Sequence, residues 1–479
     1  MKNFSEKDQL ALGVLSIGFG GTRVPMWLKP YLENGLGGIT LFGSNTPDLE
    51  ATANLVNEIR GYNPSIVISI DEEGGDVTRI YAATGNEQPS AAQLGRIDDI
   101  DFTRASYYNL GLVLNSLGID LTFAPVADIC SNSKNPIVGI RSFGDRADLV
   151  GRHVAAAVRG LQEAGTSASL KHFPGHGGVL EDSHHNLPRI RGSFVDLEAL
   201  HLEPFLSGIK AGAHSIMVGH LIVDSLDSEN AASQSPKVMR DFLRQDLAYD
   251  GVIITDALDM GALGGPANIP HSAAAAIRAG ADFLCLSGLP DQSSFVAGSM
   301  QRIVAAIEQG QIDESHLRAS ADRISKLRGL RKGLEINSDL DVNTLVKGFE
   351  LFGDPKLSKN FIRYRQLSGE PTAAAGHIKW GIEDALESAM VKVDVTNSCD
   401  AIDVLVFRDA WRDPVMWSEV VQVATRNPDC IFIDMGWPTT EFTPRNLIRT
   451  FGVGNLTSQA VRSLLVRERD RSRIVMGVE

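Results

Sequence analysis

Cysteine is scarce in this chain, with 4 residues among 479, and the four lie far apart. No two of them form the C-x-x-C pair that is typical of a zinc site, and their spacing does not suggest a disulfide framework. We therefore expect free thiols in a reducing compartment. The four residues are Cys130, Cys285, Cys399 and Cys430.

The chain also lacks an excess of positive charge. Its formal net charge is −14 at pH 7, whereas proteins that bind nucleic acid or anionic lipid present a basic face to the phosphates. We therefore expect neither nucleic acid nor a membrane surface as a partner. The negative charge places no such restriction on a neutral ligand.

Long hydrophobic runs are absent as well. No apolar stretch reaches the length of about 18 residues that a membrane-spanning helix needs. The apolar run from Leu10 to Phe19 follows residues of mixed charge, and no convincing small-residue cleavage site comes after it. A signal peptide would have a basic leader and such a site. The run therefore predicts a first buried strand, and we expect a cytoplasmic protein.

Eight short apolar runs recur in the first two thirds of the chain, with amphipathic stretches between them. After Phe42, for example, Thr46 is expected to cap a helix and Pro47 to take its first position. Eight alternating β and α units predict a TIM barrel. A doubly wound open sheet is the alternative, but no G-x-G-x-x-G follows the first run. The predicted strands are Leu12–Gly18, Gly38–Phe42, Ile66–Ile70, Leu121–Ala124, Ser169–Phe173, Ser215–Val218, Val252–Thr255 and Phe283–Leu286.

The patterning divides the chain into three parts. The barrel is predicted to span residues 1–340. Hydrophobic periodicity fades over residues 341–400, which are expected to form a linker with some helix. Apolar runs return at Ile402–Phe407 and Cys430–Asp434, with a helix-like stretch between them. This βαβ-type pattern predicts a small α/β domain over residues 401–479.

Polar side chains follow many of the predicted strands, at the point where each strand ends. Barrel enzymes place their chemistry at the C-terminal ends of the strands, so these side chains should converge on one mouth. Any single one could instead cap a helix or join a buried salt bridge. Their equivalent positions favour a shared site. The residues are Asp71, Asp128, Arg141, Lys171, His172, His220 and Asp256.

The segment from Lys171 to His184 reads KHFPGHGGVLEDSH and is rich in glycine, histidine and carboxylates. A metal site is one interpretation, but the imidazoles form no i,i+4 ligand pair and no cysteine is near. A dyad of Asp182 and His184 fits better, because the carboxylate can hold the imidazole pKa near neutrality. The glycines indicate that the loop from Gly175 to Asn186 is mobile and closes over a bound ligand.

The motif KHFPGHG followed by DSH-x-x-LP resembles the signature of the β-N-acetylglucosaminidases of glycoside hydrolase family 3, which recycle bacterial cell-wall fragments. Other segments agree with that family in the same order, namely GGITLF, DEEGGDVTR, APVADI, GIRSFG and GVIITDALDM. The resemblance implies a retaining, exo-acting hydrolase on a TIM barrel, with no metal or organic cofactor. Its substrate would be a carbohydrate with terminal β-linked N-acetylglucosamine (GlcNAc).

The resemblance also implies a role for each matching residue. Asp256 falls on the catalytic nucleophile, with Asp259 as its nearby competitor. His184 and Asp182 fall on the acid/base dyad, whereas His185 falls on an unconstrained position of the motif. The sugar-binding positions fall on Asp71, Arg79, Arg141, Lys171 and His172.

Some of these residues have a structural alternative. Arg79 could form a salt bridge that supports the DEEGG turn instead of binding sugar. His176 and Asp128 are better interpreted as loop or supporting residues, and His220 could merely line the pocket.

The sequence departs from the family pattern in three places. Asp76 stands where the family's motif has arginine, which removes a positive charge beside the pocket. Gly178 replaces an acidic residue that is common after the GHG. The C-terminal segment looks like a shortened version of the family's αβα sandwich, and it is a candidate surface for homodimer formation.

Three other functions stay open. A β-glucosidase would use the same scaffold, but that branch usually takes its acid/base from the second domain, and the DSH motif argues against it. A GlcNAc phosphorylase is also compatible, because a neutral imidazole repels phosphate less than a carboxylate would. An inactive sugar-binding protein is the alternative of another class, and the intact Asp256, Asp182 and His184 argue against it.

Overall fold

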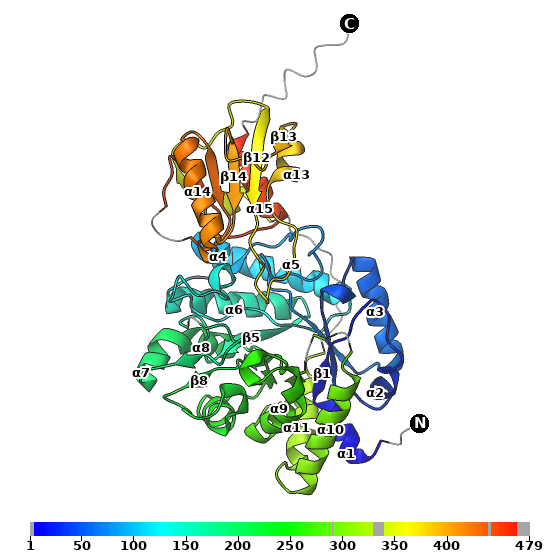
Figure 1. Ribbon diagram of the computed structural model, residues 1–479. Helices are drawn as coiled ribbons and strands as arrows, with labels where there is room; N and C mark the ends of the chain where they lie inside the picture. Colours follow the sequence, from blue (N-terminus) through cyan, green and yellow to red (C-terminus); the bar gives the residue numbers. More distant parts are fainter. Residues whose placement is uncertain are drawn as a thin grey trace.

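The chain forms a parallel barrel followed by a smaller sheet domain, which lies against one side of the barrel (Figure 1). In the part of the chain that the structure describes, no helix is long and apolar enough to cross a membrane. The computed structural model describes residues 4–179, 181–286, 288–289, 291–328, 340–438 and 442–466.

The barrel sheet has eight parallel strands in the order β10-β1-β2-β3-β4-β5-β7-β9. A parallel bridge between Ile254 and Phe283 joins the two ends of this order, so the sheet closes. The predicted TIM barrel is confirmed, and each of the eight predicted runs supplies its strand. These strands are β1 (Leu15–Ile17), β2 (Gly38–Leu41), β3 (Val67–Ile70), β4 (Leu121–Thr122), β5 (Ser167–Phe173), β7 (Ser215–Val218), β9 (Val252–Thr255) and β10 (Leu284–Cys285).

Helices cover the outside of the barrel, so each strand is buried on both faces and reads as a continuous apolar run. Two π-helical segments, η3 (Glu198–Leu202) and η5 (Lys237–Asp246), lie among them, and β6 (Arg189–Ile190) pairs with β8 (Ile222–Val223) beside the barrel. The α-helices are α1 (Glu6–Gly13), α2 (Lys29–Glu33), α3 (Leu49–Tyr62), α4 (Ala91–Ile97), α5 (Ile100–Ser116), α6 (Ala147–Glu163), α7 (Phe194–Leu197), α8 (Glu203–Lys210), α9 (Ile269–Ala279), α10 (Ser293–Glu308) and α11 (Glu314–Ser325).

Two local predictions near the N-terminus are wrong. The first half of the Leu10–Phe19 run belongs to helix α1 and not to a strand. This helix packs on α10 and α11, and a short apolar run looks the same whether a helix or a strand is buried. The cap of α3 is Asp48, whose side chain accepts the amide of Ala51 at 2.7 Å, and Thr46 instead precedes the helix.

The second sheet has six strands in the order β11-β16-β15-β14-β12-β13, and all neighbours are parallel except β11 and β16. Helices flank this sheet, which makes it a doubly wound α/β domain. The elements are α12 (Val342–Val346), β11 (Glu350–Phe352), β12 (Phe361–Leu367), α13 (Glu383–Glu387), β13 (Lys392–Val395), β14 (Val404–Phe407), α14 (Pro414–Arg426), β15 (Ile431–Asp434), β16 (Asn446–Arg449) and α15 (Asn455–Leu465).

The interpretation of residues 341–400 as a linker is wrong, because three of the six strands come from this stretch. Strand β12 shows why the pattern was missed. Its charged residues Arg363 and Arg365 alternate with the buried Ile362 and Tyr364, so it lacks the continuous apolar run by which the barrel strands were found.

The two domains make direct contact above helix α4. The Ser90 hydroxyl, at the cap of α4, donates to the carbonyl of Phe451 at 2.6 Å, and the Gln93 amide donates to the carbonyl of Thr450 at 3.0 Å. The guanidinium of Arg96 lies 4.5 Å from the centre of the Phe451 ring. Figure 1 shows α4 and α5 between the barrel and the smaller domain. These contacts place the smaller domain close to the mouth of the barrel.

Candidate active site

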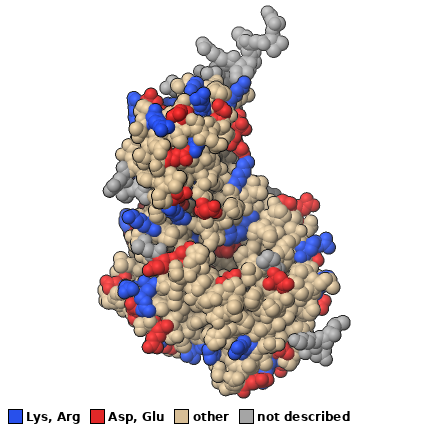
Figure 2. Space-filling view, in the orientation of Figure 1, with Lys and Arg blue, Asp and Glu red and all other residues tan. Residues whose placement is uncertain are grey.

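A cavity of about 430 Å³ lies at the carboxyl ends of the barrel strands. Figure 2 shows a hollow on this face where the two domains meet, with acidic and basic side chains around it. Seven of the eight predicted site residues line the cavity, and Asp182 reaches it through its hydrogen bond to His184. The seven are Asp71, Arg79, Arg141, Lys171, His172, His184 and Asp256.

A network of charged side chains surrounds Lys171, which is buried within β5, two residues before the strand ends. Its ammonium group lies 2.7 Å from Oδ1 of Asp71 and 2.6 Å from Oε1 of Glu73. Arg141 donates two hydrogen bonds to Glu73, at 2.9 and 2.8 Å, in the bidentate geometry that strengthens such pairs. Burial raises the pKa of Asp71, but the charges of Lys171 and Arg79 outweigh burial and hold this pKa well below its usual range. Asp71 therefore presents an ionised, hydrogen-bond-accepting group to the cavity.

Two glutamates that shape this network were not among the predicted site residues. Glu73 joins Lys171 to Arg141, and its side chain is 5% exposed. Glu72 accepts the backbone amides of Arg79 and Ile80 at 2.8 and 3.1 Å, and burial raises its pKa to about 7. They are the two residues after Asp71 in the DEEGG segment, and this position just beyond β3 is the sequence feature that could have identified them as site residues.

Asp256 follows β9 and lines the cavity as an ionised carboxylate. Its Oδ1 accepts the backbone amide of Ala257 at 2.8 Å. Burial raises the pKa of Asp256, but the nearby imidazoles of His172, His220 and His184 outweigh it, and the net shift is downward. A carboxylate that stays ionised in a buried site is suited to act as a nucleophile.

His172 is oriented by Asp128, which is completely buried. Nδ1 of His172 lies 2.6 Å from Oδ2 of Asp128. Oδ1 of the same carboxylate accepts the backbone amides of His172 and His176. Burial raises the pKa of Asp128, but the charge of His172 and these hydrogen bonds reverse the shift and lower the pKa to about 2. Asp128 therefore acts as the supporting residue that the sequence suggested.

Asp182 and His184 form the predicted pair. Oδ1 of Asp182 lies 2.7 Å from Nδ1 of His184 and also accepts the backbone amide of His184 at 2.8 Å. Burial lowers the pKa of His184, but the hydrogen bond to Asp182 and the charge of Asp256 reverse the shift and raise it above its ordinary value. Because Nδ1 donates to the carboxylate, Nε2 is the ring nitrogen that can exchange a proton with a substrate.

The described residues of the loop that carries this pair contact the rest of the barrel through their backbone. The carbonyl of His184 accepts the backbone amide of Gly261 at 3.0 Å, and Asn135 donates to the carbonyls of His176 and Val179. A Cβ at Gly177 would lie 1.8 Å from the backbone oxygen of Ile129. The glycine here therefore permits close backbone packing, and exchange with an open loop stays a prediction.

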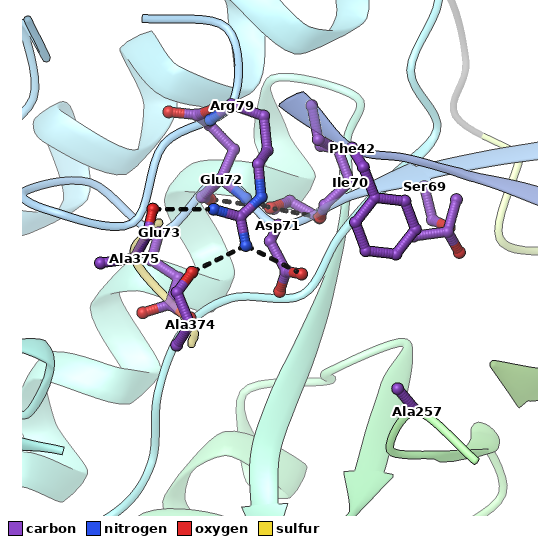
Figure 3. A network of polar contacts seen from close by, with 12 residues as sticks. Phe42, Ser69, Ile70, Asp71, Glu72, Glu73, Arg79, Ala257, Ala374 and Ala375 are labelled. Carbon is purple, nitrogen blue, oxygen red and sulfur yellow. Dashed lines mark hydrogen bonds and ion pairs between the residues drawn. The ribbon is translucent and has the colours of Figure 1, made fainter. Parts of the chain in front are cut away.

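A strap from the smaller domain, residues 368–380, reaches the barrel mouth, and its residues 373–377 line the cavity. The guanidinium of Arg79 donates to the carbonyls of Ala374 and Ala375, at 2.8 and 3.2 Å, and lies 3.5 Å from Oδ2 of Asp71 (Figure 3). Arg79 thus lines the site and also ties the strap to the segment that begins with Asp71. The sequence did not place the smaller domain in the site.

Three further candidates lie in different surroundings. His220 is completely buried, where it contacts the Ser233 hydroxyl and the carbonyl of Ala257, and it is not part of the cavity lining. His176 and Asp259 do line the cavity, and Nε2 of His176 lies 3.1 Å from the Ser183 hydroxyl.

Asp76, which stands where the family's motif has arginine, lies outside the main cavity. Its Oδ2 is 3.8 Å from Nη1 of Arg408 in the smaller domain. Burial raises the pKa of Asp76, and the charge of Arg408 opposes the shift. An arginine from the second domain therefore stands beside the position at which the family carries its own.

No group of three or more His, Cys, Asp or Glu side chains is arranged to hold a metal ion within the described ranges of the chain. The imidazoles of the loop contact carboxylate and hydroxyl groups instead, as in the pairs His184–Asp182 and His176–Ser183. That the reaction needs no metal stays a prediction.

Comparison with known proteins identifies relatives of the whole chain and of its barrel. The model of the "Glycosyl hydrolase family 3 N terminal domain" matches residues 26–327. A beta-hexosaminidase of Methylococcus capsulatus is 30% identical over 298 residues, which cover 60% of this chain and 89% of that protein. Beta-hexosaminidase A of Pseudoalteromonas piscicida is 32% identical over 320 residues, but these cover 61% of this chain and 53% of that relative.

A solved structure resembles both domains together. The glycoside hydrolase family 3 beta-N-acetylglucosaminidase from Paenibacillus sp. str. FPU-7 superimposes with a TM-score of 0.85 and is 27% identical, and the match covers 97% of each chain. The smaller domain is therefore shared with this neighbour and is not peculiar to this chain.

The closed barrel carries a buried carboxylate and a histidine–aspartate pair at one mouth, and its match to the family model makes the chain a glycoside hydrolase. The family model covers more than half of the chain. The chain belongs to glycoside hydrolase family 3.

Proposed function

We propose that the chain is a retaining, exo-acting β-N-acetylglucosaminidase that releases terminal β-linked GlcNAc from cell-wall fragments, either muropeptides or chitooligosaccharides. The observation that carries the proposal is that Asp256 and the His184–Asp182 pair open into the same cavity. The names of the relatives, beta-hexosaminidase and beta-N-acetylglucosaminidase, support the choice of sugar.

In the proposed reaction, the carboxylate of Asp256 attacks the anomeric carbon while the C–O bond to the leaving group breaks. Protonated His184 gives its proton to the departing oxygen, so the leaving group departs as a neutral alcohol. A water molecule then attacks the glycosyl-aspartate, and neutral His184 takes the proton from this water. The product keeps the β configuration, and Asp256 and His184 return to their starting states.

The charged network would bind and orient the terminal sugar. Asp71 offers ionised oxygens that accept hydrogen bonds, while Lys171 and Arg141 offer donors, and directed contacts of this kind select among sugar hydroxyls. Arg79 and the strap close one side of the cavity. A bounded cavity of this size suits the end of a glycan chain, which supports exo action.

An assay with four arms tests the proposal directly. Aryl β-GlcNAc and aryl β-glucoside are compared, each with and without inorganic phosphate. We expect kcat/KM to favour the GlcNAc substrate by roughly 10²-fold or more, because a site built to hydrogen-bond a substituent rejects the analogue without it. We also expect free GlcNAc as the product in both arms with that substrate. Faster turnover of the glucoside, or formation of a sugar phosphate, would assign one of the alternative activities.

The pH dependence should report on the histidine pair. Asp182→Asn removes the charge that raises the pKa of His184, so this pKa should fall. Because protonated His184 is needed to release the leaving group, the alkaline limb of kcat/KM should move to lower pH in the variant. Asp101→Asn, an exposed change on α5, is the matched control and should leave the profile in place. An unmoved limb in Asp182→Asn would show that His184 is not the titrating acid.

A further inference from the structure

A second cavity, of about 340 Å³, lies at the carboxyl ends of β12 and β14 in the smaller domain. These two strands are neighbours, but the chain leaves β12 toward β13 on one side and later continues from β14 toward β15 on the other. The strand order therefore reverses between them. In doubly wound sheets, ligands bind in the crevice at this point. Among the described residues, the second cavity shares none of its lining with the active-site cavity.

Two buried arginine donors in this cavity have no hydrogen-bond acceptor within the part of the chain that the structure describes. They are Nη1 of Arg408 and Nε of Arg412. The guanidinium of Arg408 lies 5.1 Å from the centre of the Trp380 ring, and its Nη1 is 3.8 Å from Asp76, too far for a hydrogen bond. Buried donors without acceptors are unfavourable, and oxygen atoms of a ligand would satisfy them.

Carboxylates line the same cavity and restrict the chemistry of that ligand. Asp76, Asp409 and Glu370 line it together with Asp413, one oxygen of which caps α14. A simple anion would be attracted by the arginines and repelled by these carboxylates. A simple cation would be attracted by the carboxylates and repelled by the arginines. Hydroxyl groups suit both, because each can accept from an arginine and donate to a carboxylate.

We propose that this second cavity is a saccharide-binding site. Its volume lies in the range of roughly 300 to 1,000 Å³ that small-molecule sites occupy, and Trp380 supplies an aromatic surface among planar polar groups. The site takes a sugar or sugar unit through hydroxyls that bridge Arg408 and Glu370. The choice of GlcNAc units as the sugar rests on the proposed function.

The strap connects this site to the active site. Gly369, Glu370, Thr372 and Trp380 line the second cavity, while residues 373–377 between them line the first. A saccharide in the second cavity therefore contacts the same segment that Arg79 holds against the barrel mouth.

The test is calorimetric titration of the full chain carrying Asp256→Ala with N,N′,N″-triacetylchitotriose, which this variant is expected not to cleave. We expect two binding sites per chain. Adding Glu370→Gln or Arg408→Lys should weaken binding at one of the two sites tenfold or more. Glu370→Gln removes a charged acceptor. Arg408→Lys removes the planar guanidinium group but keeps a positive charge beside Asp76. Adding Asp71→Asn should weaken the other site alone.

Glu387→Gln, an exposed change on α13 outside the cavity lining, is the control and should keep both sites. A single site that only Asp71→Asn weakens, or a second site that neither Glu370→Gln nor Arg408→Lys weakens, overturns the inference. Binding of inorganic phosphate or of glycine at the Arg408-dependent site, in place of the saccharide, overturns it as well. If the Asp256→Ala chain shows a single site that Glu370→Gln and Arg408→Lys weaken, and no site that depends on Asp71, the result counts against the proposed function and not against the second cavity.

Discussion

Asp256→Ala should fold normally and lose turnover of aryl β-GlcNAc by roughly 10⁴- to 10⁶-fold, the range expected when a catalytic nucleophile is removed. In the native protein, the carboxylate of Asp256 lines the cavity and accepts the amide of Ala257. Three nearby histidines lower its pKa, so it stays ionised. Steady-state kinetics measures the loss, and circular dichroism with a melting curve shows whether the variant is folded.

Asp259→Ala is the matched control, because Asp259 lines the same cavity three residues further along the chain. It should keep most of the activity. Sodium azide offers a second readout with Asp256→Ala, since it can enter the space that the removed carboxylate leaves and attack the anomeric carbon. The product should then be the α-glycosyl azide. Substantial activity in Asp256→Ala, or loss in Asp259→Ala alone, would show that the wrong aspartate is assigned.

His184→Ala should slow the turnover of a substrate more strongly when the leaving group of that substrate needs a proton to depart. Turnover of chitobiose, whose leaving group is a poor one, should fall by roughly 10²- to 10⁴-fold, the usual contribution of general acid catalysis. Formation of the glycosyl-enzyme from an activated dinitrophenyl glycoside should change much less, because this leaving group departs without a proton. Pre-steady-state kinetics separates this step from the later hydrolysis, which also uses His184.

The neighbouring His185 provides the control for this result. Its side chain is exposed, whereas that of His184 is 29% exposed and hydrogen-bonded to Asp182. His185→Ala should affect neither class of substrate strongly. Equal losses with both substrates in His184→Ala would indicate a structural role, and inactivation by a chelator that zinc reverses would revive the metal interpretation.

The barrel could be predicted from sequence because the burial of each strand is visible in the strand's own residues. A strand buried on both faces must be apolar along its length, so residues such as Val252–Thr255 stand out without knowledge of their partners. Polar residues directly after such strands, such as Asp71 and Asp256, then fall at one mouth by the geometry of the barrel.

The contribution of the second domain could not be predicted in the same way. Arg79 binds the strap through the carbonyl oxygens of Ala374 and Ala375, and every residue carries a carbonyl, so the side chains give no signal. The strap also lies almost 300 positions from Arg79, and its place depends on how the two domains dock. Strand β12 was missed because its partly exposed face carries charged residues.

The most direct test of the account is to trap the covalent intermediate. A 5-fluoro β-GlcNAc fluoride should react quickly with the protein and then hydrolyse slowly, because the fluorine at carbon 5 destabilises both transition states while the fluoride leaving group speeds the first. Peptide mapping by mass spectrometry should find one fluorinated N-acetylglucosaminyl group, attached to Asp256. Attachment to Asp259 or another residue, or turnover with inversion and no adduct, would contradict the account.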